Sequence, residues 1–147
     1  MPTYIFHAKY KNYDDLWCEV EMLGEHTLDD LHCILFNVFG FPEEKLYSFF
    51  MSNEAWDAES EYCSPLVEGD HADDVSLDDL GLKIGDKFLY LFDYGVNHEF
   101  EIELLEIGEQ EDISEDYPHL LAEEGELPSE FLIDPDDPSK IIEDEVN

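Results

Sequence analysis

The sequence predicts an α+β fold, a mixed β-sheet with one main helix packed on a face, β-grasp-like and ubiquitin-like in outline. Alternating apolar segments flank one capped amphipathic segment, and the 147 residues are 44% hydrophobic, enough for one core. A short C-terminal helix and an acidic tail complete the expected architecture. We therefore expect one α+β domain over residues 1–131 and an acidic, flexible tail over residues 132–147.

Two alternating segments near the start of the chain predict a β-hairpin. Apolar side chains occupy every second position in residues 4–10 and again in residues 16–22. The polar stretch 11–15 separates them and has the composition of a turn. One face of this hairpin should therefore be buried.

The next segment has the features of a helix with both ends specified. Thr27 to Asp30 has the form of a capping box, with Asp in place of the usual Glu, and Gly40 is placed to end the helix. Apolar residues recur between them at helical spacing, at Leu28, Leu31, Ile34, Leu35, Val38 and Phe39. The sequence indicates this element more strongly than any other.

The middle of the chain predicts one strand and then irregular structure. Residues 46–51 read as a strand, reached through the turn at residues 41–44. Residues 52–74 are acidic and irregular, with large side chains that should hold the segment on the sheet. Residues 75–80 predict a single helical turn that ends at Gly81.

Two further strands are expected before the composition changes. Residues 87–93 are apolar on both faces, which is typical of a central strand, whereas residues 99–107 alternate apolar residues with glutamates. Residues 93–97 should form the turn between them, with Gly95 or Asn97 at a positive φ. Residues 116–125 predict the short C-terminal helix, with Pro118 in its first turn.

The charge of the chain excludes some classes of partner. Forty Asp and Glu face six lysines, the chain has no arginine, and the formal net charge is −34. Direct binding to nucleic acid draws on Lys and Arg at the phosphates, so we expect none, and we expect no binding to an anionic membrane. Adaptation to high salt, a basic protein partner or solubility could each account for the acidic excess.

Cysteine content and the N-terminal residues favour the cytoplasm. Three cysteines, Cys18, Cys33 and Cys63, are an odd number without the spacing of a zinc or redox site. The first ten residues lack a basic region followed by an apolar stretch, and no segment has the length of a membrane span. We expect a cytoplasmic protein with no metal and no cofactor.

Two places in the sequence hold residue types that catalysis uses. His32 on the helix could act as an acid, a base or a metal ligand, but no second ligand lies one turn away, so a structural role is favoured. Asp93 and His98 could pair across the turn to activate a nucleophile, although Asp at a turn more often bonds its own backbone. The acidic stretch 134–137 lacks the glycine and terminal glutamate of a calcium loop. We therefore expect no catalytic residues.

Aromatic residues suggest a docking surface. Protein interfaces use Tyr and Trp as anchors, and a sheet face that the helix leaves uncovered would present them together. Filling of the core is the alternative for each of them. The expected interaction surface consists of Trp17, Trp56, Asp93, Tyr94, Asn97 and His98.

Several motifs together resemble one family. They are TLDDLHCILFNVFGF at residues 27–41, LYSFFM with the later Trp56, SLDDLGLKIGDKFLYLFDYG at residues 76–95, and YPHLLAEEGELPSEF at residues 117–131. In this order they are similar to the plasmid pRiA-type "ORF three"-like family, some of whose genes lie beside mobile elements. The resemblance implies the fold and no established activity. The chain has Val96, Asn97 and His98 where the family usually has an acidic residue, a polar residue and a tryptophan.

Three functions are weighed on these grounds. A non-enzymatic adaptor that binds a protein partner, possibly a basic one, comes first, because no catalytic constellation is visible and the charge has one sign. The second is an acidic mimic that occupies the nucleic-acid site of a basic protein. The third is an enzyme that uses His32 or the Asp93 and His98 pair.

Overall fold

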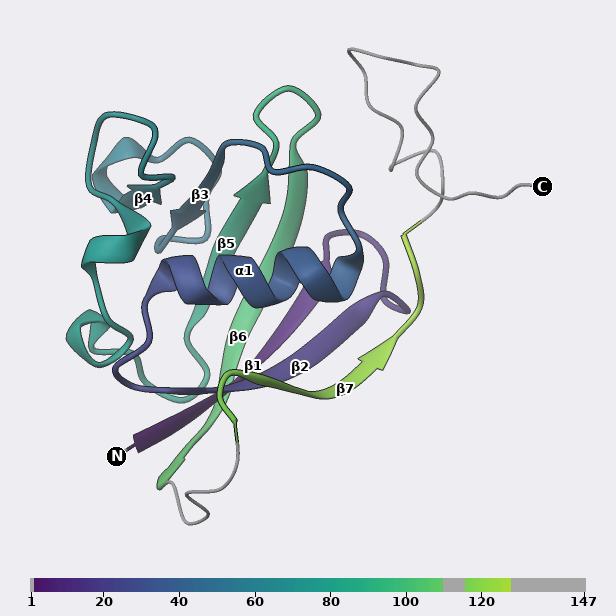
Figure 1. The fold of residues 1–147 in the computed structure, drawn as a ribbon, viewed down its shortest axis with the longest axis vertical. Coiled ribbons are helices and arrows are strands. Elements are labelled where there is room, and N and C mark those ends of the chain that lie inside the picture. The colour runs from purple at the N-terminus through teal and green to yellow at the C-terminus, as the bar shows by residue number, and fades with distance from the viewer. Residues whose placement is uncertain (1, 110–115, 128–147) are drawn as a thin grey trace.

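A seven-stranded sheet carries one long helix across one face (Figure 1). The computed structural model describes residues 2–109 and 116–127. The sheet has the order β4-β3-β5-β6-β1-β2-β7, and every pair of named strands in it is antiparallel. The strands and helix are β1 (Pro2–Tyr10), β2 (Trp17–Leu23), α1 (Leu28–Phe39), β3 (Tyr47–Phe50), β4 (Glu61–Cys63), β5 (Lys87–Phe92), β6 (His98–Glu109) and β7 (His119–Glu124).

The expected hairpin and helix are confirmed. β1 and β2 pair with Phe6 opposite Val20, and both side chains are fully buried beneath the helix. Thr27 caps α1: its side chain accepts from the backbone N–H of Asp30, whose carboxylate accepts from the N–H of Thr27. Gly40 ends the helix at φ 75°, in the left-handed region that glycine adopts without strain.

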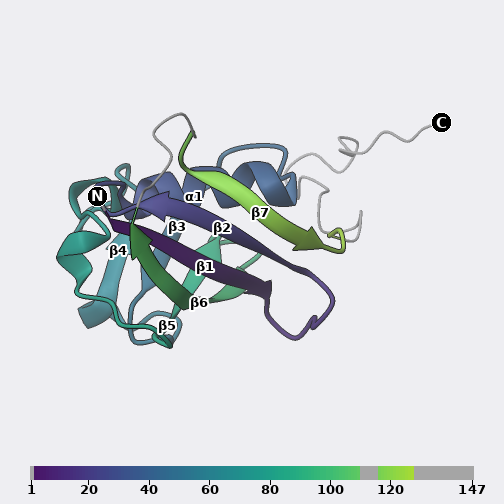
Figure 2. The same ribbon diagram turned by 90° about the horizontal axis from the view of Figure 1, so that it is seen from below.

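The core lies between α1 and the sheet. Leu28, Leu31 and Leu35 of the helix have no exposed surface, and they face alternate residues of the strands. Figure 2 shows the helix on one side of the sheet. The opposite side, called the open face below, has a smaller cluster of buried apolar residues formed by Phe50, Leu89 and Leu91. This division follows from the alternation of side chains along each strand.

The middle segment is more ordered than its composition suggests. β4 lies within residues 52–74, where irregular structure is expected, and pairs with β3 at the edge of the sheet. Three short 3₁₀ turns accompany it: η1 (Ala58–Ser60), η2 (Ala72–Asp74) and η3 (Asp78–Leu80). The last of these is the helical turn predicted for residues 75–80.

The prediction of a short C-terminal helix is wrong. Residues 119–124 form β7, which extends the sheet beyond β2. A helix of this length is marginal in water, whereas a strand gains hydrogen bonds from the free edge of β2. Side chains add to the pairing: Trp17 Nε1–H donates to Glu124 at 2.9 Å, and His119 Nε2 lies 3.0 Å from Glu21.

The prediction of a mixed sheet is also wrong, because all the strand pairs in the described ranges are antiparallel. The β-grasp outline is thus not confirmed beyond one helix crossing one face. The domain end at residue 131 and the tail at residues 132–147 lie outside the described residues. No helix in the described ranges is long and apolar enough to cross a membrane.

Candidate functional site

The turn between β5 and β6 uses Asp93 structurally. Asp93 Oδ1 accepts the backbone N–H of Gly95 at 3.0 Å and that of Val96 at 3.3 Å. Asp93 and Asn97 have positive φ values of 70° and 64°, so the expectation for Asn97 is confirmed, whereas Gly95 has no positive φ. A short polar side chain tolerates this conformation because it bonds its own backbone. The carboxylate of Asp93 therefore shapes the turn.

His98, expected on an interaction surface, is a core residue with 3% of its surface exposed. Its Nδ1 lies 2.9 Å from the hydroxyl of Tyr10, and its ring packs on Phe41 at a centroid distance of 4.9 Å. Burial lowers the pKa of His98 from its usual value, against the opposing charge of Asp93. The alternation of β6 turns this side chain toward the helix, which is why it is not on the surface.

The two tryptophans lie at opposite ends of the open face. Trp17 packs on His7 at 5.0 Å, whereas Trp56, 52% exposed, packs on Phe50 at 5.7 Å and Tyr94 at 5.2 Å. Four strand spacings separate β2 from β3, a distance of roughly 19 Å. Trp56 and Tyr94 thus form one aromatic group near the β5–β6 turn, and Trp17 belongs to another.

His32 is the centre of a buried polar chain. Its Nε2 lies 2.6 Å from a carboxylate oxygen of Glu44, and its Nδ1 lies 2.6 Å from the hydroxyl of Tyr90. The imidazole stacks on the ring of Tyr47 at 3.8 Å, and the hydroxyl of Tyr47 donates to Asp29. Only 1% of His32 is exposed.

The direction of each hydrogen bond in this chain follows from the charge states. Burial lowers the pKa of His32 despite the nearby charge of Glu44, so the ring is neutral at pH 7. A carboxylate only accepts, so Nε2 carries the proton and donates to Glu44. Nδ1 is then an acceptor, and the hydroxyl of Tyr90 donates to it. Burial raises the pKa of Tyr90 well above its usual value, so this hydroxyl keeps its proton. Both ring nitrogens of His32 thus have hydrogen-bond partners within the protein.

Lysines lie among the carboxylates of the open face. Glu101 lies opposite Lys9, and Glu103 lies opposite both His7 and Lys87 on the two neighbouring strands. Opposite charges across strands stabilise a sheet, and they also interrupt the array of carboxylates. The acidic mimic requires carboxylates along one surface at phosphate-like spacing, and on this face lysines lie between the carboxylates.

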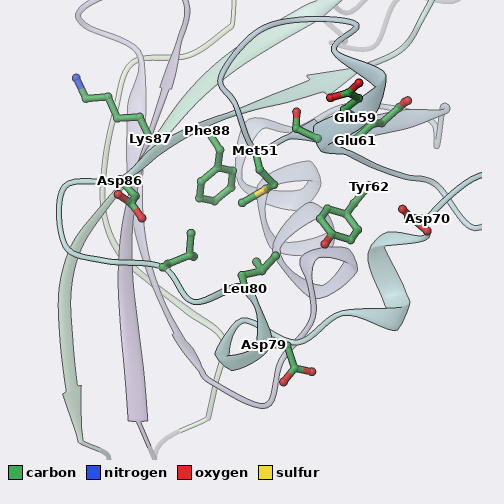
Figure 3. A pocket seen from close by; sticks show the side chains of 12 residues that line it. Met51, Glu59, Glu61, Tyr62, Asp70, Asp79, Leu80, Asp86, Lys87 and Phe88 are labelled. Carbon is green, nitrogen blue, oxygen red and sulfur yellow. The ribbon is translucent and has the colours of Figure 1, made fainter.

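A pocket of about 530 Å³ opens where β3, β4 and β5 meet the 3₁₀ turns (Figure 3). The end of β3, β4 and the start of β5 supply one wall, and residues around η3 supply the other. Apolar side chains from both walls line its interior, with Met51, Phe88 and Leu80 near the centre of the view. The remaining apolar or aromatic lining comes from Tyr62 and Leu82. This volume lies within the range of sites that bind small ligands.

Carboxylates surround this apolar interior. They come from four separate parts of the chain, and Figure 3 shows them on several sides of the pocket: Glu59, Glu61, Asp70, Asp79 and Asp86. Lys87 is the single cationic residue of the lining, and its ammonium is directed away from the centre. Sequence reasoning missed this pocket because its acidic residues stand far apart in the chain, among many others.

The carboxylates of the pocket differ in what they already bond. Glu61 accepts the hydroxyl of Ser48 at 2.5 Å, and Asp86 accepts the backbone N–H of Lys83 at 2.9 Å. Within residues 2–109 and 116–127, the carboxylates of Asp70 and Asp79 accept no hydrogen bond. These two groups are therefore available to a cation that enters the pocket.

Within residues 2–109 and 116–127, one group of side chains has ligand atoms close enough to hold a metal ion. Nitrogen and carboxylate oxygens of His71, Asp73 and Asp74 lie within 4.8 Å of one another at η2. His71 Nε2 is 2.6 Å from the carbonyl oxygen of Val67, which leaves Nδ1 facing Asp74 at 3.8 Å. Both aspartates are exposed, and exposed acidic side chains of this kind commonly lie together without an ion.

Comparison with known proteins identifies relatives of unknown function. The profile of the family described as "Plasmid pRiA4b ORF-3-like protein" matches residues 9–134. Among solved structures, the crystal structure of the protein of unknown function MM3350 from Methanosarcina mazei Go1 is similar, with a TM-score of 0.66 and 22% identity over 83% of this chain and 68% of that chain. At this identity the likeness concerns the fold. A search of curated proteins found no match.

Proposed function

Because the chain belongs to the plasmid pRiA4b ORF-3-like family, for which the matched structure offers no activity, we propose its function from the pocket. The proposed function is that of a non-enzymatic interaction module that binds a basic protein partner. The pocket of about 530 Å³ at β3, β4 and β5, with its apolar interior and acidic rim, carries this proposal.

Electrostatics supports a basic partner at this site. Five carboxylates and one lysine line the pocket, in a chain whose formal net charge is −34. Such a field speeds the encounter with a positively charged protein at low salt and repels phosphate. The apolar interior supplies burial, which acidic residues on a flat surface do not.

The positions of the candidate catalytic groups also support a binding role. His32 is buried and bonded on both ring nitrogens, and Asp93 bonds the backbone of its own turn. Burial raises the pKa of Cys18 to about 12 and that of Cys33 to about 11, so both are thiols at neutral pH. None of these groups is positioned as an activated nucleophile or base.

We also propose a cytoplasmic location. Cys18, Cys33 and Cys63 are all free in the structure, and Cys33 is exposed. Free thiols of this kind suit a reducing compartment.

Affinity purification with a matched pair of variants tests the binding role. Asp70→Asn with Asp79→Asn removes two charges from the pocket, and Glu25→Gln with Asp73→Asn removes two charges from exposed positions outside it. Each full-length protein is used as bait in native lysate at low and moderate salt, and captured proteins are quantified by mass spectrometry. A basic protein captured by wild type and control, but lost with the pocket variant, is expected. Identical captured sets for all three baits would refute the proposal.

A further inference from the structure

We propose that the pocket at β3, β4 and β5 receives an arginine side chain of the partner in preference to lysine. This inference rests on the proposed function and names the group that the pocket recognises. Three features of the pocket carry it: the distribution of carboxylates, the apolar interior, and the aromatic ring beside the rim.

The carboxylates lie on more than one side of the pocket. Glu59 and Glu61 lie on one side of the pocket, Asp70 lies beside Tyr62, and Asp79 lies below them in Figure 3. A guanidinium has five donors in a rigid plane and reaches acceptors on more than one side at once. The ammonium of lysine is a compact, strongly hydrated charge without this planar arrangement of donors. Acceptors on several sides therefore favour arginine.

The interior of the pocket favours the same group. Met51 and Leu80 are partly buried and give the centre of the pocket an apolar surface, with the fully buried Phe88 beneath it. A guanidinium is more weakly hydrated than an ammonium, so it loses less when it leaves water. Its stem is also apolar and can pack on these side chains.

Tyr62 provides an aromatic contact at the rim. Its side chain lines the pocket next to Asp70, and within residues 2–109 and 116–127 its hydroxyl has no hydrogen-bond partner. Arginine stacks on aromatic rings through its planar group, which lysine lacks. A ring beside a carboxylate thus complements both the plane and the charge of a guanidinium.

The arginine must come from a different protein. The chain contains six lysines and no arginine, so a second copy cannot supply the group. Lys87 lines the pocket but points away from it, so it leaves the interior open. The partner is therefore a protein with an exposed arginine, which the acidic field attracts.

Three peptides that differ in one side chain test the inference. The probes are acetylated, amidated Gly-Leu-Xaa-Leu-Gly, in which Xaa is arginine, lysine or neutral citrulline. Each is titrated into full-length, isotope-labelled protein at low salt, and binding is followed by amide chemical shifts in NMR spectra. The arginine peptide is expected to bind about tenfold more tightly than the lysine peptide, and the citrulline peptide more weakly than both.

Variants locate the binding and separate the two proposals. Asp70→Asn with Asp79→Asn should weaken the arginine peptide about tenfold, and Glu25→Gln with Asp73→Asn should leave its affinity unchanged. Equal affinity for the arginine and lysine peptides, lost with the pocket variant, would overturn the preference for arginine and keep the basic-partner proposal. Absence of binding by both peptides, or shifts confined to residues outside the pocket, would overturn both.

Discussion

Replacement of Tyr90 by phenylalanine tests the buried chain that joins Glu44, His32 and Tyr90. The substitution keeps the ring and removes the hydroxyl that donates to His32 Nδ1 at 2.6 Å. That nitrogen then has no donor in a site where only 1% of His32 is exposed. A buried acceptor left without its partner costs about 1–3 kcal/mol, so we expect the free energy of unfolding to fall by that amount.

Urea unfolding followed by tryptophan fluorescence and circular dichroism measures this loss. The dependence of the free energy on urea should not change, because the surface exposed on unfolding stays the same. Tyr62→Phe is the matched control, since the hydroxyl of Tyr62 has no hydrogen bond within the described ranges. A loss for Tyr90→Phe that is equal to the loss for Tyr62→Phe would refute the assigned hydrogen bonds.

A double-mutant cycle makes the test more specific. His32→Leu removes the acceptor, and the double variant with Tyr90→Phe has neither partner. Replacement of both partners by apolar groups leaves neither the donor nor the acceptor of this bond in the core. The carboxylate of Glu44 can be hydrated instead, because its side chain is 57% exposed. The loss of unfolding free energy in the double variant should therefore be smaller than the sum of the two single losses, by about 1 kcal/mol or more. Strict additivity would contradict the direct bond.

Two further predictions concern stability. Gly24→Ala places a Cβ against the carboxylate of Asp78, which accepts the hydroxyl of Tyr4 at 2.8 Å. The carboxylate must move and this hydrogen bond is lost, so we expect a loss of about 1 kcal/mol in urea unfolding, and no loss would contradict this packing. Burial lowers the pKa of His32 and of His98, so the unfolded chain takes up protons before the folded one. The stability that the two neutral histidines contribute is then fully present above about pH 6.5, and it is lost as the pH falls through their folded pKa values. His32→Gln should lose less stability than wild type between pH 7.5 and 5.5, and equal losses would count against the shift.

The elements predicted well from sequence are those whose signals are local. α1 carries its cap, its apolar face and its terminating glycine within residues 27–40, so no distant contact is needed to recognise it. The β5–β6 turn is similar, since Asp93 and Asn97 supply the conformation it needs. Both therefore follow from short stretches of sequence.

The elements missed are those that depend on partners far along the chain. β7 is a strand because β2 offers a free edge, and Glu21 and His119 that meet there are 98 positions apart. β4 has only three residues and is specified by its pairing with β3. The pocket depends on the same distant contacts, because Glu61, Asp70 and Asp79 come together only when η3 packs beside β4. Local sequence patterns carry no information about contacts between such distant residues.

The placement of β7 has a consequence for the newly made chain. β2 is synthesised about one hundred residues before β7, its neighbour at the end of the sheet. Throughout that interval on the ribosome, the outer edge of β2 has unpaired backbone groups that another nascent chain could extend into an aggregate. Glu19 and Glu21 of β2 give that exposed edge negative charge, which opposes such association between identical copies.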